Sequence, residues 1–374
     1  MVAKRQALNP PILPGYTYVR PLGSGGFADV FLFQQNMPRR VVAVKVLLAK
    51  VDDPASTKAL ASEADVMAGL SSHPAILTVY EASVAPDGRP YLVMEYCPGS
   101  LATRFRTEHI PIDEVLSIGV KIAGAVESAH SVGMLHRDIK PSNILVTSFG
   151  HPVLSDFGVA SGAVAGEEDL IAMSPPWSAP ELVQRRSSGT VATEVWALAA
   201  TVYTLAAGRA PFDVPGGRRS DEQLKARIVR AKYVPTGRDD ASQEFEDALA
   251  GGLRRLPADR YPSARAFGEA LQAVQRGMGL AVTPLEIPRD DWGSLPDALD
   301  TPQGPSRSTV PVDSSRQRRT PAPSRTGTTL TGTGTGTGAE LQSTPLSRGI
   351  LIGIIIAGAA LVGAAVAALL VLGG

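Results

Sequence analysis

Three polar side chains lie close together in one short stretch of the chain. Residues 135–145 read Leu-His-Arg-Asp-Ile-Lys-Pro-Ser-Asn-Ile-Leu, which places Asp138, Lys140 and Asn143 two and three positions apart. A second acid, Asp156, follows in Val-Leu-Ser-Asp-Phe-Gly, at the end of a predicted strand. Phosphoryl transfer needs a carboxylate that accepts a hydroxyl proton, oxygen ligands for Mg²⁺ and an ammonium group near the transferred phosphoryl. The residue types and their spacing therefore indicate phosphoryl-transfer chemistry.

A glycine-rich turn and a strand with one lysine precede this stretch. The predicted strand Tyr18–Leu22 leads into Gly-Ser-Gly-Gly-Phe-Ala-Asp-Val at residues 23–30, and glycine lets a backbone approach phosphate oxygens closely. The turn alone is equally typical of an ordinary hairpin. A further predicted strand, Val41–Leu48, carries Lys45 in Val-Ala-Val-Lys. The succession of turn, strand and lysine favours phosphate binding.

In order and spacing, these motifs resemble those of bacterial eukaryotic-type (Hanks-type) serine/threonine protein kinases. The triplet Ala-Pro-Glu at residues 179–181 and the loop Leu256–Pro262 extend the resemblance, which covers about residues 16–276. It implies an α+β, bilobal protein kinase fold, with a small, mainly β N-lobe that has one helix and a larger α-helical C-lobe. It also implies ATP and Mg²⁺ as cofactors and protein serine or threonine hydroxyls as substrates.

The resemblance implies the catalytic roles. Asp138 would orient and deprotonate the substrate hydroxyl, and Lys140 would steady the γ-phosphoryl group. Asn143 and Asp156 would hold Mg²⁺. A lysine two positions after the catalytic aspartate, in Asp-Ile-Lys-Pro, is the serine/threonine-kinase form, so this specificity follows by family analogy.

The resemblance also implies an ATP site formed by the glycine-rich turn, the lysine strand and the hinge. Lys45, held by Glu63 of the N-lobe helix, would position the phosphates, and the hinge would bind adenine through its backbone. We expect Cys97 to be a half-buried hinge residue without a redox role, because the chain has no second cysteine to resolve an oxidised form. The implied residues are Leu22, Gly23, Ser24, Gly25, Gly26, Phe27, Val30, Ala43, Lys45, Glu63, Glu95 and Cys97.

Three positions depart from the family pattern. Ala28 replaces the third glycine of the phosphate loop, and Ser174 replaces a threonine that faces the substrate; both changes are expected to be mild. Glu194 replaces the helix aspartate that anchors the catalytic loop, and its extra methylene must be absorbed in a packed region. The resemblance further implies an ion pair between Glu181 and Arg260.

Periodicity and turn signals predict the elements that position these residues. Strands are expected at Ile76–Tyr80 and Pro90–Glu95, around a turn at Asp87–Gly88. His130, near the end of a long helix, is expected to pack under the catalytic loop and to take no part in the chemistry. The expected helices are Asp52–Leu70, Asp113–Val132, Glu194–Leu205 and Ser263–Gln275.

The composition narrows the functional classes. The chain of 374 residues balances 36 Lys and Arg against 36 Asp and Glu, so no global field favours nucleic acid, and none is expected as a partner. Its single cysteine excludes an internal disulfide and a cysteine-based zinc cluster. The start, Met-Val-Ala-Lys-Arg-Gln, is not followed by an apolar run, so no cleavable secretory signal is expected.

Changes in composition divide the chain into four regions. Residues 1–15 are interpreted as an N-terminal extension and residues 16–278 as the kinase domain. Residues 279–348, rich in Pro, Ser, Thr and Gly, are expected to be a disordered juxtamembrane linker. Residues 349–374 are expected to form one transmembrane helix, because Ile350–Leu372 has no charge or proline and, at about 1.5 Å per residue, can cross about 30 Å of hydrocarbon. A buried soluble helix is the alternative.

These regions suggest a setting and partners. Arginines precede the expected span, so the positive-inside tendency predicts a single-pass cell-membrane protein with a cytoplasmic kinase domain. Phosphothreonines in the linker would recruit a phosphopeptide-binding module, and small residues in the span would allow a homodimer. Two functions remain: a protein kinase, autophosphorylation included, in membrane-associated signalling, or a catalytically weak pseudokinase acting as a membrane-tethered scaffold. The complete catalytic set favours the kinase.

Overall fold

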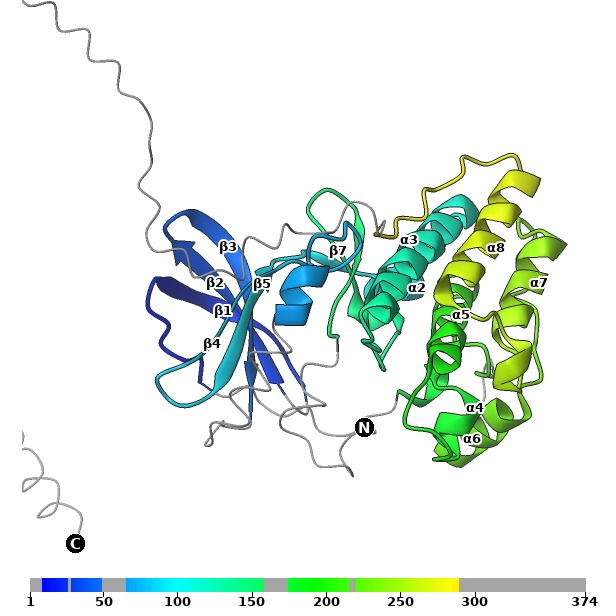
Figure 1. Ribbon diagram of the computed structural model, residues 1–374, viewed down its shortest axis with the longest axis horizontal. Coiled ribbons are helices and arrows are strands. Elements are labelled where there is room, and N and C mark those ends of the chain that lie inside the picture. Colours follow the sequence, from blue (N-terminus) through cyan, green and yellow to red (C-terminus); the bar gives the residue numbers. More distant parts are fainter. Residues whose placement is uncertain (1–8, 26–27, 49–64, 158–173, 215–219, 289–374) are drawn as a thin grey trace, which may run out of the picture. The chain divides into compact units, whose positions relative to one another are not determined.

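The computed structural model describes residues 9–25, 28–48, 65–157, 174–214 and 220–288. Along these residues most strands come before the helices, as the colours of Figure 1 show. One antiparallel sheet has the strand order β1-β2-β3-β5-β4, and a small second sheet has the order β6-β7-β8. The strands are β1 Tyr16–Ser24, β2 Ala28–Asn36, β3 Arg39–Leu47, β4 Val79–Val84, β5 Pro90–Glu95, β6 Gly99–Ser100, β7 Ile144–Val146 and β8 Pro152–Leu154.

The larger sheet buries alternate side chains of its strands on one face. Phe31 and Phe33 of β2 pack there with Val42, Val44 and other residues of β3 and β5. Alternation then directs the intervening residues of β2 and β3 to the opposite face. Leu13, within the predicted N-terminal extension, joins this core and is only 3% exposed. Asn9 accepts a hydrogen bond of 2.9 Å from Arg89 at its carbonyl, so the described part of the extension, residues 9–15, belongs to the folded N-lobe.

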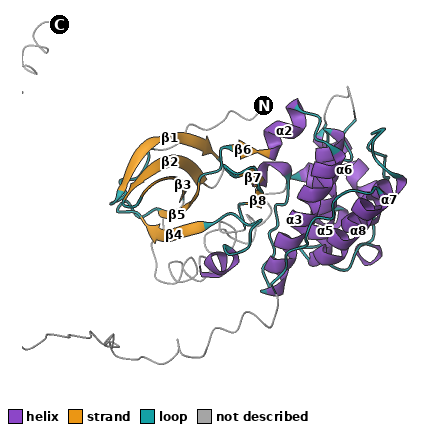
Figure 2. Ribbon diagram, turned by 90° about the horizontal axis from the view of Figure 1, so that it is seen from above, coloured by secondary structure: helices purple, strands orange, loops and turns teal. Residues whose placement is uncertain are grey.

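A carboxylate joins the two edges of the same sheet. Tyr16 of β1 donates a hydrogen bond of 2.6 Å from its hydroxyl to Glu81 of β4, and Tyr91 of β5 donates one of 2.9 Å to the other oxygen. Strands β1 and β4 are the outermost strands of the sheet. The sheet must curl to bring them together, and Figure 2 shows this curvature.

The helices form the α-helical C-lobe. Helices α3, α5, α7 and α8 pack against one another (Figure 1), with Trp196 of α5 fully buried. A capping box of Thr190 and Thr193 begins α5, and Gly208, with φ of 66°, ends it. The helices are α2 Leu101–Thr107, α3 Ile112–Ser131, α4 Pro180–Val183, α5 Val191–Ala207, α6 Asp221–Arg230, α7 Gln243–Gly252 and α8 Ala264–Gly277; residues 65–70 are also helical, and Pro141–Asn143, Pro175–Trp177 and Pro257–Asp259 are single 3-10 turns.

One predicted strand is displaced. The sequence favoured Ile76–Tyr80, whereas β4 is Val79–Val84. Ile76 instead forms a parallel bridge with Leu154, and the backbone of Leu77 also bonds to that residue. The first residues of the predicted strand thus pair with β8, and only its last two residues, Val79 and Tyr80, belong to β4. The predicted β5, the turn at residues 87–88 and the helices around α3, α5 and α8 are confirmed.

The folded domain continues beyond its predicted end. Residues 279–288, assigned to a disordered linker from the sequence, are described and bonded to α8: Gln275 donates to Thr283 and accepts from its backbone. The linker prediction is therefore wrong for these ten residues. In the described part of the chain no helix is long and apolar enough to span a membrane. The predicted span, residues 349–374, lies outside that part.

Candidate active site

The carboxylate of Asp138 is held from three sides. Lys140 places its Nζ 2.6 Å from one oxygen, Oδ2, and the Asn143 amide donates to the same oxygen at 3.0 Å. Ser174 donates from its hydroxyl to the other oxygen, Oδ1, at 2.8 Å, and Lys140 donates to that hydroxyl at 2.7 Å. The three residues predicted for the catalytic loop are therefore brought together. The serine hydroxyl lies between the carboxylate and the ammonium group, where charge-assisted hydrogen bonds are strong.

The contact of Ser174 predicts its contribution to catalysis. We expect Ser174→Ala to lower kcat about tenfold to a hundredfold, because a hydrogen bond to a charged group contributes about 1.5–3 kcal/mol. Ser174→Thr retains the hydroxyl and is expected to keep near wild-type kcat. Steady-state peptide phosphorylation with the two variants tests this. Equal losses in both variants would show that the hydroxyl contributes nothing.

A buried carboxylate of α5 anchors the backbone of the catalytic loop. Glu194, 3% exposed, accepts hydrogen bonds from the backbone N–H groups of His136, at 3.0 Å, and Arg137. His130 of α3 donates its Nε2–H to the same carboxylate at 2.8 Å. Arg137 has a φ of 67°, in the left-handed region, so these bonds hold an unusual backbone conformation. Glu194 thus anchors the catalytic loop although its side chain is one methylene longer than the aspartate of the family pattern. His130 supports the loop, as predicted.

The surroundings of Glu194 keep it ionised. Burial raises the pKa of the carboxyl, but the hydrogen bond from His130, the His136 ring and the Arg137 N–H together lower it by more. The pKa of Glu194 therefore lies below its ordinary value. An anionic anchor faces three donors, each of which would lack a partner without it.

Removing this charge is expected to destabilise the fold. Glu194→Gln leaves one donor facing an amide N–H₂ group, and a buried unsatisfied group costs about 1–3 kcal/mol. The free energy of unfolding, measured in urea, should fall by that amount. Glu269→Gln is the matched control: its partner Arg265 is 61% exposed, and such surface pairs contribute about 0–1 kcal/mol. Equal effects of the two substitutions would contradict the anchoring role.

The second acid of the motif lies beside the predicted lysine. Lys45 places its Nζ 2.7 Å from Asp156, whose side chain is 45% exposed. Partial burial raises the pKa of Asp156, but the Lys45 ammonium, His136 and Lys140 lower it by more, so the pKa lies below its usual range. Asp156 has a φ of 62°. A carboxylate is thus held ionised next to an ammonium group.

This arrangement fits Mg²⁺. The Asn143 side chain donates through its N–H₂ group to Asp138. Its amide oxygen accepts from the Ser142 hydroxyl at 3.3 Å and keeps a second lone pair for a ligand, and Asp156 offers an exposed carboxylate. Mg²⁺ commonly binds to one or two protein carboxylates and completes its shell with water and phosphate oxygens. Within the described ranges, no three His, Cys, Asp or Glu residues form an all-protein metal cage. Asp156 and Asn143 would therefore hold the ion together with ATP phosphates.

Three of the predicted ATP residues of the sheet, Val30, Ala43 and Lys45, share one face. Val30 is directly opposite Lys45 on β2 and β3, and Gly23 on β1 is directly opposite Val30. Ala43 lies two positions before Lys45 and therefore points to the same side, away from the face of Phe31 and its neighbours. Leu22 and Ser24 flank Gly23 on β1, and Gly25 donates its N–H to the Ala28 carbonyl at 2.8 Å.

Two further observations concern the sequence predictions for this site. Ala28 is 9% exposed, with its methyl group in the hydrophobic core, so the missing glycine is accommodated. Glu95 donates its N–H to the Thr78 carbonyl, and Cys97 is half-buried, with the pKa of its thiol raised to about 12 by burial and by Glu95.

Three predicted residues lie outside the described ranges: Gly26, Phe27 and Glu63. The pairing of Lys45 with Glu63 therefore remains a prediction.

The predicted ion pair of the C-lobe is confirmed. Arg260, whose side chain is fully buried, donates to both oxygens of Glu181, at 2.7 and 2.9 Å. Its guanidinium also lies 5.0 Å from the ring of Trp196. This bidentate pair fixes the end of the segment that carries Ser174.

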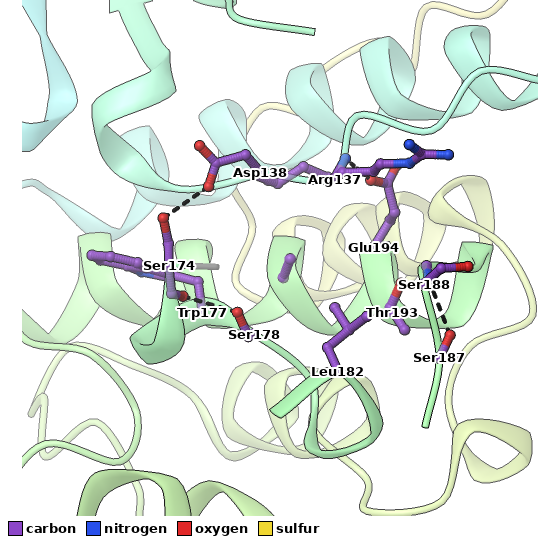
Figure 3. A pocket seen from close by; sticks show the side chains of 13 residues that line it. Arg137, Asp138, Ser174, Trp177, Ser178, Leu182, Ser187, Ser188, Thr193 and Glu194 are labelled. Carbon is purple, nitrogen blue, oxygen red and sulfur yellow. Dashed lines mark hydrogen bonds between the residues drawn. The ribbon is translucent and has the colours of Figure 1, made fainter. Parts of the chain in front are cut away.

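A pocket opens beside the catalytic aspartate. Figure 3 shows Asp138 and Ser174 on one side and Ser187 and Ser188 on the other. Thr193 also lines the pocket, so several hydroxyl groups surround it. Sequence reasoning missed Ser187, Ser188 and Thr193, because no motif marks them; the local signal was a Ser-Ser-Gly turn at residues 187–189. Hydroxyl groups therefore line this pocket next to the Asp138 carboxylate.

Comparison with known proteins agrees with this geometry. Residues 16–272 match the protein kinase domain family. The chain is similar to the serine/threonine-protein kinase PknK of Mycobacterium tuberculosis and of Mycobacterium bovis, with 40% identity over 282 residues, which are 73% of this chain and 25% of PknK. It is also similar to the serine/threonine-protein kinase PknI of Mycobacterium tuberculosis, with 30% identity over 333 residues, 82% of this chain and 52% of PknI. The chain thus spans about a quarter of PknK and about half of PknI.

The family match covers more than half of the chain and includes every site residue described above. The two relatives carry the same catalytic class in their names. The chain therefore belongs to the protein kinase family, whose cofactors are ATP and Mg²⁺.

Proposed function

We propose that the chain transfers the γ-phosphoryl group of ATP to serine and threonine hydroxyls of proteins, its own included. One observation carries the proposal: the Ser174 hydroxyl donates to Asp138 Oδ1 while the Lys140 ammonium lies 2.7 Å from the same hydroxyl oxygen. An alcohol is thus already held between a proton acceptor and a cation. A substrate hydroxyl bound at Asp138 would find the same two groups.

The residues of the site would divide the work as follows. Asp138 accepts the proton of the substrate hydroxyl, and this proton transfer makes the hydroxyl oxygen a stronger nucleophile. Lys140 and Lys45 would place positive charge beside the phosphates of bound ATP. Asp156 and Asn143 would hold Mg²⁺, which neutralises charge on the phosphate oxygens.

The acceptor specificity is testable. The full chain is incubated with ATP, Mg²⁺ and three peptides that differ only in a central serine, threonine or tyrosine. We expect phosphorylation of the serine and threonine peptides and little of the tyrosine peptide, because the shorter hydroxyls match the position of Ser174 beside Asp138. Preferential tyrosine phosphorylation would contradict the proposal.

The cellular setting is a second part of the proposal. Residues 349–374 would anchor the kinase domain at the cytoplasmic face of the cell membrane, for the charge distribution and the apolar run of the sequence support such an anchor. A reporter fused after Gly374 is expected on the far side of the membrane. A cytoplasmic reporter would overturn this orientation.

The linker and the span also suggest partners. Threonines of the linker, such as Thr320 and Thr326, would be autophosphorylated and recruit a phosphothreonine-binding module. Small residues such as Gly353 would support homodimerisation of the span. Mass spectrometry of the incubated protein and the self-association of a Gly353→Ile span test these two ideas separately.

A further inference from the structure

A segment after the last helix turns back along the C-lobe. Gly279, with φ of +67°, reverses the chain, and Leu280 donates its N–H to the Gln275 carbonyl at 2.9 Å. Gln275, 1% exposed, then binds Thr283 twice, at its N–H and its hydroxyl, both at 2.9 Å. Gln272 donates to the Thr283 carbonyl at 2.8 Å. Two glutamines of α8 thus hold this segment, residues 279–288, which we call the strap.

Two glycines make room for the strap. A Cβ atom on Gly124 of α3 would lie 2.4 Å from the Glu286 carbonyl oxygen. A Cβ atom on Gly268 of α8 would lie 2.9 Å from Leu285. Both distances are too short for real atoms, so the strap lies directly on the glycine surfaces of these two helices.

The far end of the strap reaches the loop before β4. The His73 ring, in a residue 8% exposed, donates from Nε2 to the Glu286 carbonyl at 2.9 Å and accepts at Nδ1 from the Ala75 N–H at 3.0 Å. A carbonyl only accepts and an N–H only donates, so these contacts require the neutral ring with its proton on Nε2. The strap therefore fixes both the orientation and the tautomer of His73.

The loop held by His73 pairs with β8, the strand that precedes Asp156. Leu154 donates its N–H to the Ala75 carbonyl at 2.8 Å, and Leu77 donates to the Leu154 carbonyl at 2.9 Å. Asp156 follows Leu154 by two residues. A continuous series of hydrogen bonds thus leads from the strap through His73 and Ala75 to the strand that presents Asp156.

We propose that the strap positions Asp156 for binding of ATP with Mg²⁺, and that His73 is the positioning residue that connects the two. This inference rests on the proposed function of Asp156. The strap is also the part of the chain that connects the kinase domain to residues 289–374. Coupling of this kind travels through packed elements and hydrogen bonds.

Three full-chain variants test the proposal. Gly124→Ala places a methyl group against the Glu286 carbonyl and should displace the strap, whereas alanine is otherwise favoured in a helix. Gly277→Ala is the matched control, because the space around that helical glycine is open. His73→Asn keeps an acceptor for Ala75, with Oδ1 in place of Nδ1, and removes the donor to the strap.

The first measurement is the dissociation constant for ATP with Mg²⁺, with hydrogen exchange at Leu154 recorded on the same samples. We expect Gly124→Ala and His73→Asn to weaken ATP binding about two- to thirtyfold and to speed exchange at Leu154, while Gly277→Ala matches wild type. KM for the peptide should stay unchanged in all three, because the strap does not touch the pocket beside Asp138.

ATP affinity in Gly124→Ala and His73→Asn equal to that of Gly277→Ala would overturn the proposal. A general loss of folding would instead lower the fraction of active protein. The apparent kcat would then fall while the dissociation constant of the remaining folded protein for ATP stayed at the wild-type value, which also contradicts a positioning role. The binding measurement needs no turnover. If the wild-type chain bound ATP but failed to phosphorylate any peptide, the proposed function would fail and the comparison of affinities would still decide the role of the strap.

Discussion

Replacing Asp138 with asparagine will lower kcat for peptide phosphorylation by about 10²- to 10⁴-fold, the range of a general base. Asparagine has nearly the same volume, so the loop should remain in place. It is a far weaker base than a carboxylate, and its N–H₂ group opposes either Lys140 or the Ser174 hydroxyl. ATP affinity should remain close to that of wild type, because Lys45 bonds to Asp156, whereas the described contacts of the Asp138 carboxylate are with Lys140, Asn143 and Ser174.

Asp240→Asn is the control for this experiment. It makes the same chemical change at a 47% exposed carboxylate paired with Arg238, in the loop before α7. Initial rates at saturating ATP should be unchanged in that variant. A kcat for Asp138→Asn equal to that of Asp240→Asn would mean that Asp138 takes no part in the chemistry.

Arg260→Ala is expected to lower the free energy of unfolding by about 3–5 kcal/mol, as is typical when one partner of a buried ion pair is removed. The guanidinium also donates to the carbonyls of Ala192, Arg254 and Arg255. Its loss leaves the Glu181 carboxylate, with a side chain only 15% exposed, without its charged partner. Lysine should restore little, because it cannot reproduce the bidentate geometry.

Urea unfolding of the full chain measures this effect. Arg265→Ala serves as the control, because Arg265 forms an ion pair with Glu269 in which both side chains are more than half exposed. We expect that control to change the free energy of unfolding by less than about 1 kcal/mol. Equal values for the two variants would contradict a structural role for the Glu181–Arg260 pair.

The local sequence correctly predicted those elements whose pairing partners are near in the chain or whose apolar pattern repeats over many residues. Helix α3 was expected at Asp113–Val132 and is Ile112–Ser131, because its apolar positions recur through five turns. The displaced strand shows the limit. Its first residues pair with Leu154, about 80 positions later, and no local pattern carries that information.

The strap illustrates the same limit in a different way. Its Pro and Thr residues and its position next to the Ser-, Thr- and Gly-rich residues that follow favoured a linker, although five of its ten residues are apolar. It packs because Gly124 and Gly268, on separate helices, leave surfaces for Glu286 and Leu285. Only the assembled C-lobe brings those glycines together.

The site residues were easier to predict than their contacts. Asp138, Lys140 and Asn143 lie on one short loop, so their proximity follows from spacing, and the Glu181–Arg260 pair followed from family resemblance. The individual hydrogen bonds of Glu194 and Ser174 followed neither from sequence spacing nor from the resemblance. Whether a longer acid could accept from three donors depends on the position of α5 relative to the loop, which sequence spacing does not determine.

The most direct test of the central claim is phosphoryl transfer itself. The full chain is incubated with radiolabelled ATP, Mg²⁺ and a serine/threonine peptide, in parallel with its Asp138→Asn variant, and ATP binding to both is measured. We predict Mg²⁺-dependent label on serine and threonine with wild type and nearly none with the variant, at similar ATP affinity. ATP binding by wild type without any transfer above the variant would contradict the kinase and favour a pseudokinase scaffold.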